Sequence, residues 1–347
     1  MRHGLSVRGF VSGPLSVLAL ASAAAALAIN AGSVAIAAIP NYTLVGSYAL
    51  PGGTWDVGND GRLWSIVGTS ILRQDAINSS SYSPIGSVAI ANLPSFGAAF
   101  IAVNGATGQI AIGDNNSGPG SRVHFVSAAD LNTSNPTATQ SVEVGNYNAA
   151  WDGNHLYVTG ANNATFAAQV ARIDFTNSTG APIATTVIDN AGDFSGGIAI
   201  RGSTLYTGVG FSFGGLPSTG DIRSFNTATF TGAPIAYASG VPITELLSAA
   251  SLGFDSQGNL LVGGGRFGGT DGVDTGFAAV VDLANVINPL KLAPAGFGGF
   301  HGIAWNDATG ELLVSRSGIA YRYAIPAPSA AAMLLGGFAV AARRRRR

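Results

Sequence analysis

The sequence contains no cysteine among its 347 residues. This absence excludes disulfide bonds, iron–sulfur clusters, thiolate zinc sites and a cysteine nucleophile. A folded chain without disulfides must be held together by the burial of apolar side chains, and a chain of this length can form a large core.

Charged residues are also scarce, at 10% of the chain. Seven of the 17 basic residues lie at the two ends, as Arg2, Arg8 and residues 343–347. Between the ends, ten basic residues face all 18 acidic ones, which gives this body a net charge of −8. Nucleic-acid binding depends on basic patches, so no nucleic-acid partner is predicted.

No apolar run reaches the roughly 20 residues with which a helix crosses a bilayer. The first run, residues 15–29, follows a basic start and precedes Ala35-Ile36-Ala37. A basic region, an apolar region and an A-x-A site in this order indicate a secretory signal peptide. We therefore expect residues 1–37 to form a signal helix that signal peptidase removes after Ala37 or Ala38. A retained N-terminal anchor is the alternative.

The last 23 residues, 325–347, combine a Pro-x-Pro sequence, an apolar run (330–342) and five arginines. Proline cannot donate a backbone hydrogen bond, so the two prolines end the preceding structure. An arginine cluster stays on the cytoplasmic side and holds the apolar segment in the membrane during export. This pattern predicts a processing signal with a short apolar helix, or else a plain C-terminal membrane anchor.

The tail resembles the PEP-CTERM sorting signal of bacterial envelope proteins. That resemblance implies recognition by an exosortase, a membrane-embedded protease-transpeptidase, and a location at the cell envelope, cell surface or extracellular matrix. The sequence departs from the family's Pro-Glu-Pro motif by an alanine in place of glutamate. The residues that carry the resemblance are Pro326, Ala327, Pro328, Arg343, Arg344, Arg345, Arg346 and Arg347.

The body between the two ends is built from repeats. Each repeat has an apolar strand, a short polar turn with glycine and a second apolar strand, and a third strand follows. The repeats align at intervals of 46 to 55 residues on Leu63, Ile110, Leu156, Leu205, Leu260 and Leu312. A period near 50 residues with three or four short strands indicates a β-propeller.

We therefore predict an all-β fold, a six-bladed β-propeller over residues 42–324, with seven blades as the alternative. The strand 42–50 should close the ring beside residues 319–323, because closure removes open sheet edges. No convincing amphipathic helix appears in the body, and the best candidate, 243–248, is one or two turns long. The repeats are similar to those of NHL and related six-bladed propellers, which supports the architecture but implies no activity.

Candidate site residues gather where the innermost strands should begin. His301 aligns there with Tyr147 and Asn148, so these three are predicted to line a pocket at one mouth of the channel. The equivalent positions in other repeats are mostly Gly, Ala or small hydroxyl residues. The alternative is that His301 packs against neighbouring strands.

Two further kinds of motif are less specific. Asp271 and Asp274, and the stretch Asp114-Asn115-Asn116-Ser117-Gly118, offer oxygen ligands for Ca²⁺, but ordinary turns have the same composition. Residues 210–214 match G-x-S-x-G, but more glycine and proline follow where a nucleophile elbow needs a helix. A glycine-rich loop is predicted there, and no metal or other cofactor is assigned.

Two classes of function remain. The first is an exported, non-enzymatic envelope or matrix protein whose propeller binds an envelope protein or polysaccharide, and whose tail holds it at the membrane before processing. The second is a Ca²⁺-dependent extracellular hydrolase or lyase, lactonase-like or lyase-like, that acts in the channel. The lack of clustered histidine, lysine or paired carboxylates favours the first class.

Overall fold

The computed structural model describes residues 41–52, 54–88, 97–114, 120–126, 140–174, 182–189, 196–208, 221–245, 249–264, 277–286, 290–292 and 302–325. The predicted signal peptide and the sorting tail after Ile325 lie outside these ranges. Within them, no helix is both long and apolar enough to cross a membrane.

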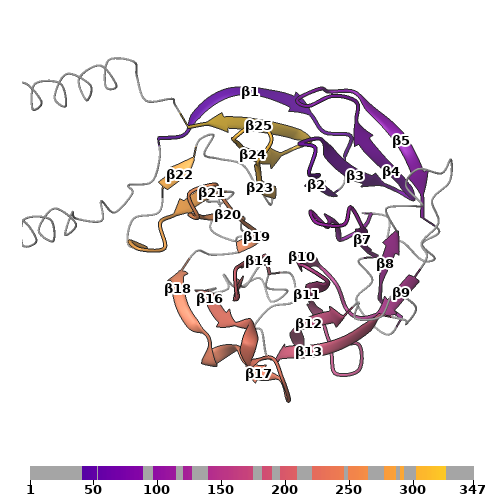
Figure 1. Cartoon of the computed structure of the whole chain (residues 1–347), viewed down its shortest axis with the longest axis vertical. Helices are drawn as coiled ribbons and strands as arrows, with labels where there is room; N and C mark the ends of the chain where they lie inside the picture. Colours follow the sequence, from indigo (N-terminus) through magenta and orange to yellow (C-terminus); the bar gives the residue numbers. More distant parts are fainter. Residues whose placement is uncertain are drawn as a thin grey trace, which may run out of the picture. The chain divides into compact units, whose positions relative to one another are not determined.

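The described residues form six sheets, which we call blades 1 to 6 (Figure 1). From the inside outward, blade 1 contains β2 (Thr54–Val57), β3 (Leu63–Val67), β4 (Ser70–Gln74) and β5 (Tyr82–Ser87). Blade 2 contains β6 (Phe100–Val103), β7 (Ile110–Gly113), β8 (Arg122–Val126) and β9 (Gln140–Glu143). Blade 3 contains β10 (Asn148–Asp152), β11 (His155–Ala161), β12 (Ala168–Asp174), β13 (Ile183–Asp189) and β17 (Ile235–Ala236).

The other three blades follow the same pattern. Blade 4 contains β14 (Ile198–Arg201), β15 (Thr204–Thr207), β16 (Asp221–Asn226) and β18 (Val241–Glu245). Blade 5 contains β19 (Ala249–Phe254), β20 (Leu260–Gly264), β21 (Phe277–Val281) and β22 (Leu290–Leu292). Blade 6 contains β23 (Gly302–Asn306), β24 (Glu311–Arg316), β25 (Ile319–Ala324) and, outermost, β1 (Thr43–Ala49).

The blades form a closed ring. Each innermost strand contacts the innermost strands of both neighbouring blades, in the order β2, β6, β10, β14, β19, β23 and back to β2 (Figure 1). All four-stranded blades are antiparallel throughout, as expected for short strands joined by hairpins. The prediction of a six-bladed propeller is therefore confirmed.

The ring is closed by a strand from the beginning of the described chain. β1 pairs antiparallel with β25, from Thr43 opposite Ala324 to Ala49 opposite Ile319. This pairing confirms the position predicted for residues 42–50. Just before β1, the Tyr42 hydroxyl donates a 2.7 Å hydrogen bond to Asp255 Oδ2 in blade 5. The same strand segment therefore fastens blade 6 to blade 5.

The hydrophobic core is divided among the junctions between blades. One cluster of buried apolar side chains lies at each of the six junctions, and each cluster draws from two consecutive blades. The residues used to align the repeats are all fully buried, namely Leu63, Ile110, Leu156, Leu205, Leu260 and Leu312. The repeat was readable from the sequence because every blade must bury the same face against its neighbour.

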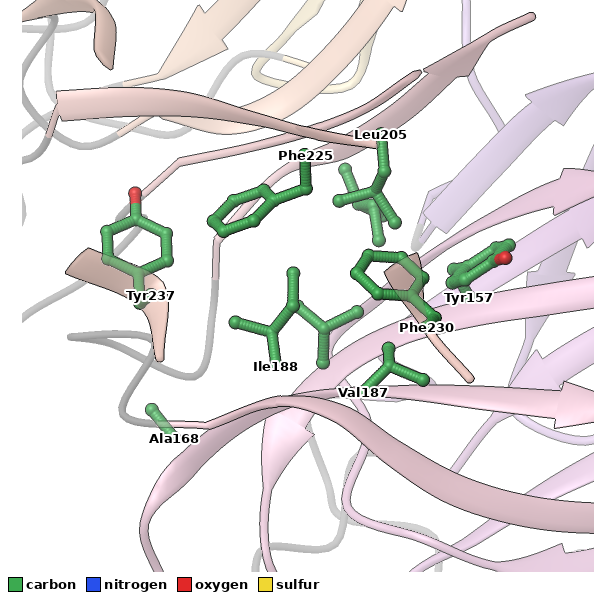
Figure 2. Close-up of a cluster of buried hydrophobic side chains, with 10 residues drawn as sticks. Tyr157, Ala168, Val187, Ile188, Leu205, Phe225, Phe230 and Tyr237 are labelled. Atoms are coloured by element: carbon green, nitrogen blue, oxygen red, sulfur yellow. The ribbon is translucent and has the colours of Figure 1, made fainter. Parts of the chain in front are cut away.

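The junction of blades 3 and 4 carries an extra element. Between β16 and β18 the chain forms two 3-10 helices, η2 (Thr227–Thr229) and η3 (Tyr237–Ser239), and between them β17 pairs in parallel with β13 of blade 3. Phe230 and Tyr237 from this segment, which we call the strap, pack with Ile188 of blade 3 and Phe225 of blade 4 (Figure 2). The strap thus seals the two blades together.

The described part of 243–248, the best helical candidate in a body expected to have no convincing helix, is a strand. Residues up to Glu245 belong to β18, which pairs with β16. Val241, Ile243 and Thr244 are β-branched residues, which favour the pleated conformation, and pairing with the blade outweighs the weak helical pattern.

The polar turns between the first two strands of the blades also join neighbouring blades. A side-chain nitrogen in one turn donates to a glycine carbonyl in the next, at 2.8 to 2.9 Å in three cases. The described donor–acceptor pairs of this kind are Asn59–Gly105, Asn104–Gly153, Arg201–Gly258 and Asn306–Gly61. The repeated Asx and Gly residues therefore form both the turn and a contact to the next turn.

Candidate functional site

The starts of the six innermost strands are the place where a pocket was predicted. The pairing register makes one residue of each blade equivalent at this level: Thr54, Phe100, Asn148, Gly197, Ser251 and Gly302. This register agrees with the alignment made from the sequence. Tyr147 and Asn148 are placed at this level, whereas His301 lies outside the described residues.

Asn148 connects blades rather than leaving its amide group unpaired. Its Nδ2 donates a 2.8 Å hydrogen bond to the carbonyl oxygen of Ala250, and its Oδ1 accepts one from Ala149 N. Ala250 belongs to blade 5, two blades further round the ring from blade 3. The Asn148 side chain therefore joins two strands that are not neighbours.

Tyr147 is held by an unusually close approach of two backbone segments. Its N–H donates to Thr159 O at 2.7 Å, and its side chain is half-buried. Two residues earlier, Gly145 lies against β11, where a Cβ would overlap the Ala161 carbonyl oxygen. A Cβ on Gly160 would likewise overlap the carbonyl oxygen of Gly145. Only glycine allows this approach, which places Tyr147 and Asn148 at the start of β10.

Hydroxyl side chains also form hydrogen bonds to backbone groups at the strand starts. Thr159 Oγ1 donates to Gly196 O at 2.8 Å, and Thr207 Oγ1 donates to Gly197 O at 3.0 Å. Ser251 Oγ accepts a 3.1 Å hydrogen bond from Ile303 N in the next blade. Polar groups at this level thus satisfy backbone groups, which would otherwise be costly to bury.

Two residues further along each innermost strand, one carboxylate stands among small side chains. The equivalent residues there are Asp56, Ala102, Ala150, Ala199, Gly253 and Ala304. Asp56 was not among the predicted site residues. The repeat alignment nevertheless places this acidic residue at the position where every other blade has Ala or Gly. The sequence therefore held a signal for Asp56 that went unused.

Asp56 is held by the backbone of two blades. Its Oδ2 accepts a 2.7 Å hydrogen bond from Val103 N in blade 2, and its Oδ1 accepts one of 2.8 Å from Val57 N. Burial raises the pKa of Asp56 to about 6, while the hydrogen bonds from Val103 and Val57 act in the opposite direction. The carboxyl therefore changes its charge close to neutral pH.

We expect the stability of the protein to depend on pH through Asp56. The native carboxyl takes up a proton at a higher pH than the unfolded one, whose pKa is 3.8, so the native state binds more protons between these values. Relative to Asp56→Ala, the wild type should gain about 2 kcal/mol of unfolding free energy as the pH falls from about 7 to about 4. Urea unfolding of both proteins at both pH values measures this difference. An equal difference in unfolding free energy between the two proteins at both pH values would contradict the raised pKa of Asp56.

The two described histidines lie away from the strand starts. His155 Nδ1 lies 2.7 Å from Asp174 Oδ1 at the start of β11, away from the strand starts. His124 is buried on β8, and burial lowers the pKa of its imidazole. The two histidines do not converge.

Asp114 is the described end of the calcium candidate at residues 114–118, and it belongs to a buried hydrogen-bond network. Asp114 accepts hydrogen bonds from Ser121 Oγ, Arg122 N and Asn146 Nδ2, at 2.9 to 3.2 Å. Asp271, Asp274 and the G-x-S-x-G stretch lie outside the described residues. Within the described ranges, no three His, Asp or Glu side chains come close enough together to hold a metal ion.

Comparison with known proteins identifies the architecture. No protein-family model matches the sequence, and no curated protein sequence is significantly similar to it. A chain in the crystal structure of the mitotic checkpoint complex is similar, with a TM-score of 0.50 and 11% identity, over 82% of this chain and 95% of that one. The chain is a β-propeller.

A second propeller is similar over most of its length. The α-L-arabinanase of Penicillium chrysogenum, solved with arabinobiose, has a TM-score of 0.52 and 10% identity, over 82% of this chain and 98% of that one. At such identities the likeness shows the fold alone. Propellers include both enzymes and binding scaffolds, so the function must be argued from the residues of this chain.

Proposed function

We propose that this protein is an exported, non-enzymatic propeller of the cell envelope or extracellular matrix, which binds a partner protein or polysaccharide through its loops. In this proposal signal peptidase removes residues 1–37, and an exosortase processes the tail 325–347. Until then the tail holds the propeller at the membrane.

The observation that carries the non-enzymatic part is the composition of the innermost strands. At the level of Asp56 the other five blades have Ala or Gly, and Asp56 itself accepts two backbone hydrogen bonds. At the strand starts, Asn148 and Ser251 are likewise engaged with backbone groups of other blades. A catalytic centre needs several polar groups directed at a substrate, and these groups are directed at the protein itself.

The export part is supported by the order of the terminal motifs. The basic, apolar and A-x-A sequence at the beginning and the Pro-x-Pro, apolar and arginine sequence at the end both match processing signals. A body of net charge −8 with no cysteine is compatible with a folded domain outside the cell.

The proposal is tested by expressing the full chain in a bacterial host that has an exosortase, followed by cell fractionation and intact mass measurement. We expect a mature form that lacks residues 1–37 and the terminal arginines and that has left the inner membrane. A deletion of residues 343–347 is the matched variant, and it should abolish the processing of the tail. Ala327→Glu restores the glutamate of the sorting motif and should process at least as fast as the wild type.

A wild-type form that keeps its five arginines and stays in the membrane fraction would refute the sorting signal. The tail would then be a plain anchor.

A further inference from the structure

The turn between β11 and β12 of blade 3, residues 162–167, is a rigid loop that presents an aromatic ring to solvent. Asn162 Oδ1 accepts hydrogen bonds from Ala164 N and Thr165 N at 2.9 and 3.0 Å. The Asn162 carbonyl accepts from Phe166 N, and Asn162 N donates to the Ala167 carbonyl, both at 2.7 Å. A fifth hydrogen bond, from Ala167 N to Thr165 Oγ1 at 3.4 Å, also lies within these six residues, and together they hold the loop in one conformation.

Phe166 has a backbone conformation that a bulky residue rarely adopts. Its φ is 57°, in the left-handed region, and its side chain is 56% exposed. The other described non-glycine residues with positive φ are Asn78 and Ser317, both small polar residues found in turns. Glycine would adopt this φ without strain. An exposed ring gains little from core packing, so the Phe166 side chain does not offset the strain, and the hydrogen bonds of the loop hold the conformation.

Asn163 connects this loop to hydrogen-bonding side chains of blade 2. Asn163, in the same loop, has its Nδ2 3.5 Å from both Ser121 O and Glu143 Oε1 in blade 2. Glu143 Oε2 in turn lies 3.8 Å from Arg122 Nη2, and these two side chains are 47% and 44% exposed. The junction of blades 2 and 3 therefore has an exposed carboxylate and an exposed guanidinium beside Asn163 of the loop, and Glu143 Oε1 also accepts a 3.0 Å hydrogen bond from Gly120 N.

We infer that the 162–167 loop binds a neutral polysaccharide, with a sugar ring stacked on Phe166 and its hydroxyl groups bonded to Glu143 and Arg122. The inference rests on the proposed function and names its ligand. A pyranose has one apolar face of C–H groups, about the size of one aromatic ring, and a rim of hydroxyls that both donate and accept hydrogen bonds. A stable protein partner would instead need about 1,200 Å² or more of buried surface with a dehydrated core. A single ring among polar side chains fits the sugar.

The test is affinity gel electrophoresis of the detergent-purified full chain through gels that contain one neutral polysaccharide each: glucan, mannan, galactan, xylan or arabinan. The wild type should be retarded by at least one of them. Phe166→Gly should weaken that retention at least tenfold while raising the Tm, since it removes both the ring and the strain. Phe166→Trp should keep the retention. Ile183→Ala, which truncates another exposed apolar side chain on the outer strand of the same blade, is the matched control and should behave as wild type.

Three outcomes would overturn the inference: no retardation on any of the five polysaccharides, equal retention of Phe166→Gly and wild type, or a lower Tm for Phe166→Gly, which would make the ring a structural support. Processing is scored separately by fractionating Phe166→Gly in the exosortase host. Normal processing with no polysaccharide binding by the wild type would refute only this inference. Failure of processing in both proteins would refute the sorting proposal without affecting the binding measurement.

Discussion

Deletion of residues 41–50 is expected to abolish cooperative folding of the propeller. These residues supply β1, the outermost strand of blade 6, and bury Tyr42 and Tyr48. Without them β25 becomes an open edge, and the junction of blades 5 and 6 loses the hydrogen bond from Tyr42 to Asp255. The loss should equal much of the stability of an ordinary domain, about 5–15 kcal/mol, and the open edge should promote aggregation. Urea unfolding followed by tryptophan fluorescence, together with size-exclusion chromatography, measures both effects.

The matched control moves the same ten residues to the other end of the body. Inserted after Ile325 through a short flexible linker, they can still pair with β25, because β1 is antiparallel to it and Thr43 lies opposite Ala324. We expect this rearranged chain to recover the cooperative transition. Recovery shows that β1 acts by closing the ring. If the deletion alone leaves the transition unchanged, closure by β1 contributes little to stability.

Replacement of Gly160 with alanine is expected to lower the free energy of unfolding by about 3 kcal/mol or more. A Cβ at this position would overlap the carbonyl carbon and oxygen of Gly145, and backbone atoms cannot turn aside as a flexible side chain can. The two segments would have to separate, which would also shift Tyr147 and its hydrogen bond to Thr159. Gly145→Ala should have a similar effect, because its Cβ would overlap the backbone of Ala161.

Gly232→Ala provides the control for this pair. Gly232 has no atom within 4 Å of an added Cβ, and its φ lies outside the left-handed region. The substitution should change the unfolding free energy by no more than about 0.5 kcal/mol. Denaturant titrations of the three variants under one condition measure and compare their unfolding free energies. Equal stabilities of Gly160→Ala and Gly232→Ala would show that the two backbone segments can separate at little cost.

Two polar residues of the site, Tyr147 and Asn148, were located from the sequence, but their roles were not. The repeat alignment placed Tyr147 and Asn148 at the start of an innermost strand, where the structure has them. The partner of Asn148 is Ala250, 102 residues away, and no local pattern indicates such a pair. Asp56 shows the same limit, since its partner Val103 is 47 residues away in the next blade.

Only some of the glycine positions could be explained from the sequence, for a related reason. Glycines in the polar turns can be explained from the neighbouring sequence, because a turn requires left-handed or extended backbone conformations at particular positions. Gly145 and Gly160 cannot be explained in this way. Both are required because two distant backbone segments meet there, and this depends on how the blades pack. The strap also escaped prediction, since β17 leaves blade 4 to pair with blade 3.

The sequence by itself determined the repeat, the strand pattern, a propeller of six or seven blades and the closing strand. Each blade buries the same face through the same short hairpins, so the information recurs within every stretch of about 50 residues. Only the tertiary structure decided which polar groups face one another, which glycines allow two backbones to meet, and that Phe166 is strained and exposed. The polar contacts and the close approach at the glycines depend on distances between residues far apart in the chain, and the energy of a polar contact changes greatly over a few ångströms. The strain at Phe166 lies within the 162–167 loop itself.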